Sequence, residues 1–230
     1  MLTKRIVCLA NSRKLSGRCV AGKETGPSGQ WIRPVSSREH EEVSYHERHY
    51  RDGGEPASLD IIDVPVLSKK AHSHQQENWL LDDAQHWVKT GVLPWDDLTG
   101  LAEPVEPLWL DGDSTMAGLS DQISIATALA ASIKSSLRLI HVPQLLLKVF
   151  APGAAFNNTK RRVQGQFTFA GRQYWLWVTD PAYENPYLRK DDGVYTIGES
   201  FLTISLGEPH RDHLYKMIAA VMPRHAEDRP

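Results

Sequence analysis

Two short segments near the start of the chain combine side chains that suit a phosphate-bearing ligand. The first, Asn11-Ser12-Arg13-Lys14, follows an apolar run and has the composition of a turn. Arg13 and Lys14 could hold phosphates, while the amide of Asn11 could read a base edge or cap the turn. A polar hairpin loop without a ligand accounts for the same residues. The segment therefore predicts a phosphate-binding turn or a plain hairpin.

The second segment is Trp31-Ile32-Arg33, which is stopped by Pro34. Side chains alternate across a strand, so Trp31 and Arg33 share one face and Ile32 takes the other. An aromatic ring beside a guanidinium equips a sheet to stack on a base and hold its phosphate. The alternative is a core tryptophan next to an arginine in an ion pair.

Charge is segregated along the chain although the formal net charge is only −2. Eight basic residues and a single acid occupy residues 1–38, whereas nine acids and one lysine occupy residues 77–113. A second basic cluster is Lys160-Arg161-Arg162. If both basic segments share a face, they create a local positive field that attracts an anionic ligand. Otherwise they are solvated loop charges.

Candidates for catalysis are isolated. Asp180 follows an apolar strand and could act as a base, but an aspartate before proline also suits a turn. Glu77 and His74 are further acid–base candidates beside Asn78, whose amide could read a base. The sequence contains no phosphate loop, dinucleotide fingerprint, metalloprotease motif or assignable triad. We therefore expect no cofactor and no metal, and lean away from an enzyme.

Strand-like segments occur in two blocks, each bounded by turn residues. The principal strands are expected over residues 4–10, 18–22, 30–33, 59–67, 137–142, 145–150, 163–169, 173–178, 200–206 and 215–222. Helices are expected over 82–90 and 120–132, with a brief one after the Ser44 to Glu47 capping box. This pattern predicts a mainly β protein of two tandem small barrels, 1–100 with a helical extension and 101–230 preceded by a helix.

Composition excludes several classes of protein. No apolar run approaches the length that crosses a bilayer, and no leader opens the chain, so we expect neither a membrane nor a secreted protein. Cys8 and Cys19 are the only cysteines and cannot form a disulfide scaffold. Both lie among apolar residues, which favours free thiols in a reducing cytoplasm.

Several strings resemble the dual OB-containing domain family of bacteria and archaea, which tends to occur in mobile or defence-associated contexts. They are KRIVCLANSRK at 4–14, GRCVAGK at 17–23, WIRP at 31–34, QENW at 76–79, VTDP at 178–181 and LTISLGE at 202–208. The resemblance implies two OB-like barrels and a role in recognising nucleic acid or a nucleotide-like ligand.

The combined expectation is a cytoplasmic nucleic-acid or nucleotide-binding module, in a bacterial defence or mobile-element context. Its expected contacts are Asn11, Ser12, Arg13, Lys14, Arg18, Lys23, Trp31, Arg33, Asn78, Lys160, Arg161 and Arg162. One alternative is an enzyme acting on nucleotides or nucleic acid through Asp180, Glu77 and His74. The other is an adaptor that binds a protein component of a defence system.

Overall fold

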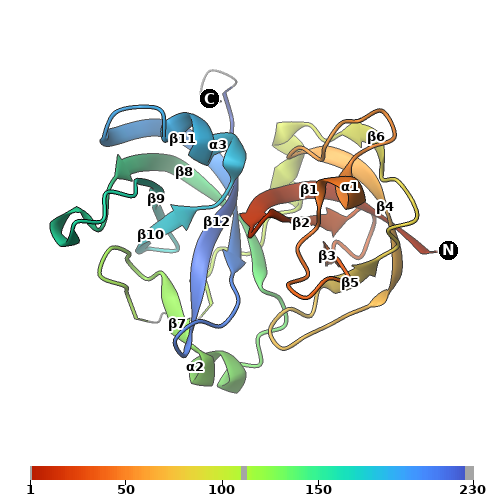
Figure 1. Ribbon diagram of the computed structural model, residues 1–230, viewed down its shortest axis with the longest axis horizontal. Helices are drawn as coiled ribbons and strands as arrows, with labels where there is room; N and C mark the ends of the chain where they lie inside the picture. Colours follow the sequence, from red (N-terminus) through yellow and green to blue (C-terminus); the bar gives the residue numbers. More distant parts are fainter. Residues whose placement is uncertain (1, 110–112, 226–230) are drawn as a thin grey trace. The chain divides into compact units, whose positions relative to one another are not determined.

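The computed structural model describes residues 2–109 and 113–225. By its contacts the chain forms two compact units, drawn in Figure 1. The first comprises Met1–Leu101 together with Lys134–Ser136, and the second comprises Ala102–Ile133 together with Leu137–Pro230. The chain thus returns to the first unit for three residues before the second barrel begins at Leu137.

The first unit is a closed barrel of five strands in the order β1-β2-β3-β5-β4, with β4 pairing back to β1. Only β3 and β5 run parallel within it. A sixth strand, β6, extends from β4, and a short helix, α1, lies between β3 and β4. The bounds are β1 Leu2–Lys14, β2 Gly17–Glu24, β3 Trp31–Val35, α1 Tyr45–Arg48, β4 Asp60–Lys69, β5 Asn78–Leu81, β6 Val88–Val92 and the 3-10 helix η1 Trp95–Gly100.

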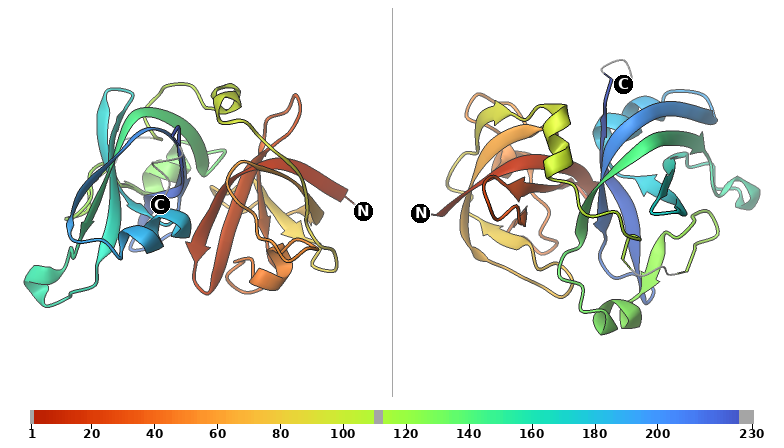
Figure 2. Two further views of the ribbon diagram at one scale, coloured as in Figure 1. Left: turned by 90° about the horizontal axis from the view of Figure 1, so that it is seen from above. Right: turned by 180° about the vertical axis from the view of Figure 1, so that it is seen from behind.

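The second unit repeats this topology in the order β8-β9-β10-β12-β11, with β11 pairing back to β8 and only β10 and β12 parallel. Figure 2 shows this closed ring of strands from two further sides. The bounds are β7 Gln122–Ser124, α2 Ile125–Ala130, β8 Leu137–Phe150, η2 Ala154–Phe156, β9 Arg162–Phe169, β10 Arg172–Val178, α3 Pro181–Tyr187, β11 Gly193–Leu206 and β12 His213–Pro223. The predicted mainly β fold of two small barrels is confirmed.

Alternation along each strand separates a buried interior from an outer face. In β9, Val163, Phe167 and Phe169 point into the core of the second barrel. Gly165 also faces inward, where an added Cβ would lie 2.2 Å from Cδ1 of Ile218. Glycine is therefore required there by close packing. The first barrel has its own core, built around the fully buried Trp87.

Two predicted helices differ from the structure. Residues 82–90 form no helix, because 88–92 pair with β4 as strand β6. The helix expected over 120–132 is shorter: β7 comes first, and α2 begins after Ser124, whose hydroxyl accepts the Thr127 N–H. In both places strand pairing with a distant segment overrides local propensity.

Pro143 does not interrupt β8, contrary to the two separate strands predicted there. It lies between Val142 and Leu145, where the register with β11 shifts. A bulge tolerates proline because no regular ladder bond needs its missing N–H.

The capping box at the start of α1 is confirmed. Ser44 Oγ accepts from the Glu47 N–H, and the Glu47 carboxylate accepts from the Ser44 N–H at 2.7 Å. Burial favours the neutral carboxyl, but hydrogen bonds from Ser36 and Ser44 outweigh it and lower the pKa of Glu47. Within the described residues, no helix has the length and apolar character needed to cross a membrane.

Asp180 is the N-cap of α3, and we expect Asp180→Ala to destabilise the second unit. Its Oδ1 accepts from the Ala182 N–H and its Oδ2 from the Val221 N–H, both at 3.0 Å. Losing a cap and leaving a buried donor unmet should cost about 2–4 kcal/mol of unfolding free energy. Urea denaturation measures this loss, with Asn185→Ala at an exposed position of α3 as the control. Equal stability of Asp180→Ala and the parent would contradict the assignment.

Candidate nucleic-acid interface

The outer face of β8, β9 and β10 in the second unit carries aromatic, amide and basic side chains in rows. Neighbouring strands place residues side by side, and alternate residues along a strand share the face. The register gives four successive rows: Thr168 with Gln173; Leu146, Gln166 and Trp175; Lys148, Gln164 and Trp177; and Phe150 with Arg162. Gln144 on β8 lines the same groove as the first row. None of these outward side chains is acidic.

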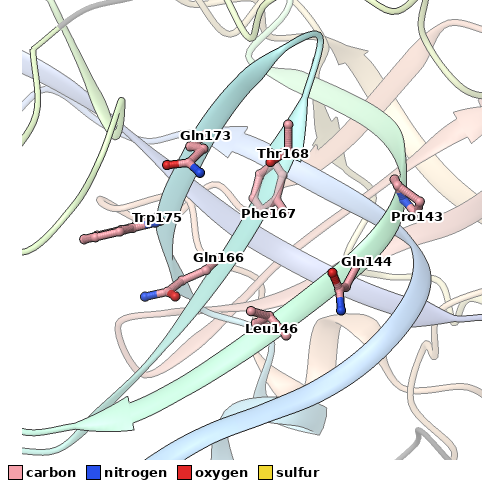
Figure 3. Close-up of a pocket in the computed structure, with 8 residues that line it drawn as sticks. All are labelled: Pro143, Gln144, Leu146, Gln166, Phe167, Thr168, Gln173 and Trp175. Carbon is pink, nitrogen blue, oxygen red and sulfur yellow. The ribbon is translucent and has the colours of Figure 1, made fainter.

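A groove of about 340 Å³ occupies the first two rows (Figure 3). Trp175 on β10 and Leu146 on β8 stand on either side of Gln166 on β9, to which both are register neighbours. Trp175 is 39% exposed, so much of its indole is accessible to a ligand. The remaining lining residues are Pro143, Gln144, Phe167, Thr168 and Gln173. The groove thus combines an accessible aromatic ring with uncharged polar groups.

The next two rows form a cluster of aromatic rings and cations. Phe150 stacks against Trp177, with ring centroids 5.9 Å apart. Lys148 Nζ lies 4.6 Å from the Phe150 centroid, and the Arg162 guanidinium lies 4.1 Å from the Trp177 centroid. Cation–π contacts hold these flexible side chains in place. Because Lys148 follows Leu146 by two positions, the positive charge lies directly beside the groove.

Two of these outward amides, Gln164 and Gln166, are hydrogen-bonded in series. Gln164 Nε2 donates to the Ala117 carbonyl at 2.6 Å, and Gln166 Nε2 donates to Gln164 Oε1 at 3.0 Å. Gln164 is only 1% exposed. Leu119 forms an isolated bridge with Trp175, so the segment that carries Ala117 is hydrogen-bonded to β10.

The equivalent face of the first barrel is organised differently. Trp31 and Arg33 lie on β3, the topological counterpart of β10. Arg33 is 4% exposed, and its Nη2 lies 3.1 Å from Glu77 Oε1 and donates to Ser136 Oγ at 2.6 Å. Lys23 Nζ donates to the Leu101 carbonyl at 2.6 Å. The charges of Arg33 and Lys23 therefore interact with groups of their own unit.

Other predicted contacts in this unit are largely enclosed. Asn11 donates to the Pro56 carbonyl at 2.8 Å. Ser12 is buried and donates to the Cys19 carbonyl at 3.4 Å. Asn78 is fully buried, and its amide donates to Gln75 Oε1. His74 is also buried. Ser12, Asn78 and His74 are thus buried and Asn11 is partly so, and their contacts with a ligand stay predictions.

The hairpin between β1 and β2 brings three predicted cations together. Arg13 and Arg18 are directly opposite each other, and Lys14 is opposite Gly17 at the tip. Like charges in opposite positions destabilise a ladder unless other groups compensate them. The phosphate-binding role of this hairpin remains a prediction.

The second basic cluster separates into different environments. Lys160 is exposed, while Arg161 pairs with Asp192 at 2.7 Å and also donates to the Leu188 and Lys190 carbonyls. Arg162 alone joins the aromatic rings on the outer face of β9.

The enzyme candidates Glu77 and Asp180 each have hydrogen-bond partners within their own unit, and their catalytic role stays a prediction. Glu77 accepts from Ser136 in the first unit, whereas Asp180 caps a helix of the second unit. Among residues 2–109 and 113–225, no three His, Cys, Asp or Glu side chains gather as a metal ion would require.

Sequence reasoning missed the most accessible part of this face. Residues 173–178 are predicted only as a strand, and no ligand contact is assigned to Trp175 or Trp177. The available signal was the alternation of Gln173, Trp175 and Trp177, which puts two indoles on one face. Lys148, Phe150 and Gln166 gave no comparable signal, because their relation to β10 depends on strand pairing.

Two closed barrels with the same strand order, each with a short helix between its third and fourth strands, define a tandem OB-fold protein. The outer face of the second and third strands is where such barrels bind oligonucleotides, so the fold is compatible with nucleic-acid binding. The chain belongs to the dual OB-containing domain family, whose model matches residues 4–221. Neither the search of curated proteins nor that of solved structures found a match.

Proposed function

We propose that the second barrel binds single-stranded nucleic acid or a nucleotide on the outer face of β8, β9 and β10. The observation that carries this proposal is the row Leu146–Gln166–Trp175, which lines a groove directly beside the cations Lys148 and Arg162. Stacking on an indole requires a base whose face is free, so an unpaired strand suits the groove better than a duplex.

Electrostatics support an anionic ligand. The rows contain Lys148 and Arg162 and no acid, and Lys160 lies just before β9. Phosphates placed over the aromatic–cation cluster would meet positive charge while the base occupies the groove. In this proposal Arg33 and Lys23 of the first barrel have a structural role, because their side chains bind other segments of their own unit.

The cytoplasmic location and the defence or mobile-element setting are part of the same proposal. Cys8, which is buried, and Cys19 form no disulfide, which supports a reducing compartment. The setting rests on the family resemblance of the N-terminal strings.

The test is titration of the full chain with single-stranded DNA, single-stranded RNA and duplex DNA at several salt concentrations. We expect single strands to bind best and affinity to fall as salt rises, because bound phosphates release counterions. Lys148→Gln should reduce the slope of log affinity against log salt by about 0.7, the value for one phosphate contact on a single strand.

The charge-matched control is Lys69→Gln, at an exposed position of β4 in the first barrel. Its salt slope should equal that of the parent. Absence of strand binding at every salt concentration would refute the proposed function, and equal slopes for Lys148→Gln and the control would refute the site.

A further inference from the structure

We infer that the groove between Trp175 and Leu146 is a subsite for the nucleobase itself, in which Gln166 selects bases that carry an exocyclic amino group and Gln164 positions Gln166. This inference rests on the proposed function and specifies which chemical edge of the ligand is read. It concerns a binding preference of the groove, independent of the phosphate contacts beside it.

The lining of the groove argues for a base and against a phosphate. None of its eight residues is charged, and three of them, Gln144, Gln166 and Gln173, are amides. A phosphate placed there would lose its hydration without a counter-charge, which is costly. A heteroaromatic base has apolar faces, which match Trp175 and Leu146, and polar edges, which match the amides. Its phosphate would remain outside, near Lys148.

The orientation of the Gln166 amide follows from the hydrogen bonds that link it to Gln164 and Ala117. A backbone carbonyl can only accept, so Gln164 must turn Nε2 toward Ala117. Gln164 Oε1 is then the acceptor for Gln166 Nε2. Gln166 Oε1 is consequently directed away from Gln164, and it lies between Trp175 and Leu146 in Figure 3. The groove therefore offers a fixed acceptor to the ligand.

A fixed acceptor distinguishes amino from keto edges. Cytosine and adenine present an amino N–H where uracil and hypoxanthine present a carbonyl oxygen. The amino N–H would donate to Gln166 Oε1, whereas the keto oxygen would face it as a second acceptor. An unmet or opposed hydrogen bond of this kind changes affinity by roughly fivefold to tenfold. We therefore expect cytidine to bind better than uridine, and adenosine better than inosine.

The experiment measures binding of these four uncharged nucleosides to the full chain, by quenching of tryptophan fluorescence and by calorimetry. Nucleosides carry no phosphate, so their affinities should not depend on salt. If single strands bind but no nucleoside does, or if amino and keto nucleosides bind equally, the base subsite is wrong while the proposed function stands. If neither strands nor nucleosides bind, both fail.

Variants distinguish the role of Gln166, which contacts the base, from that of Gln164, which positions Gln166. Gln166→Leu should abolish the preference for amino nucleosides, because it removes the acceptor. Gln164→Leu should also lower the preference, because it frees the Gln166 amide to rotate. Adding Gln166→Glu to Gln164→Leu should restore the preference, because a carboxylate needs no positioning. A purely structural role of Gln164 would give no such rescue.

Gln85→Leu, at an exposed position of the first unit, is the matched control and should leave the preference unchanged. Thermal melting confirms that each variant is folded. Because Gln166 is only partly buried, Gln166→Leu decides the inference even if Gln164→Leu does not fold. A parental preference in Gln166→Leu would overturn it.

Discussion

Replacing Trp175 with alanine is expected to weaken binding of single-stranded nucleic acid by about fivefold to a hundredfold. Stacking of one base on an aromatic side chain contributes about 1–3 kcal/mol, and Trp175 is the accessible indole of the groove. The loss should appear equally at low and high salt, because stacking involves no counterions. Fluorescence anisotropy with a labelled single strand measures it.

Two further variants isolate the contribution of the ring. Trp175→Phe keeps an aromatic face and should retain most of the affinity. Leu129→Ala removes an exposed apolar side chain from α2 and should bind like the parent. If Trp175→Ala binds as tightly as Leu129→Ala, the base does not stack in this groove.

Replacing Glu77 with alanine is expected to reduce the unfolding free energy of the first unit by about 3–5 kcal/mol, the cost of leaving a buried charge without its partner. Both members of the Arg33–Glu77 pair are buried, with side-chain exposures of 4% and 2%. Glu77 also accepts from the N–H and the hydroxyl of Ser136, so its removal leaves these two donors without that acceptor as well.

Urea denaturation, followed by probes in each unit, measures this effect. The control is Asp63→Ala, which breaks the pair with Arg5 at the surface and should cost far less, because Arg5 is well exposed. The double variant Arg33→Met, Glu77→Leu should recover much of the lost stability, since no buried charge remains. If Glu77→Ala is no less stable than Asp63→Ala, the buried pair does not stabilise the unit.

The two experiments also distinguish the roles of the two barrels. Loss of strand affinity should follow changes to Trp175 and Lys148 in the second unit. Loss of stability should follow changes to Glu77 in the first. If a folded Arg33 variant showed a reduced salt dependence of strand binding, the predicted contact of Arg33 with phosphate would be supported.

Much of the fold could be predicted from local patterns. Alternating apolar residues and turn residues predict most strands of both barrels, including the strands at 163–169 and 173–178, because these signals act within a few residues. The capping box from Ser44 to Glu47 is equally local. The segment 88–92 escaped prediction because its strand exists only through pairing with β4.

The site depended more heavily on tertiary structure. The sequence by itself determined the two mainly β barrels, the family and the presence of aromatic and basic side chains on predicted strands. It could not decide which of them face a ligand, because Arg33 and Ser136 meet across 103 positions and Trp175 meets Gln166 and Leu146 only through strand register. Burial and ion pairing are set by such distant neighbours, so only the folded chain distinguishes the enclosed Trp31 and Arg33 from the open groove at Trp175.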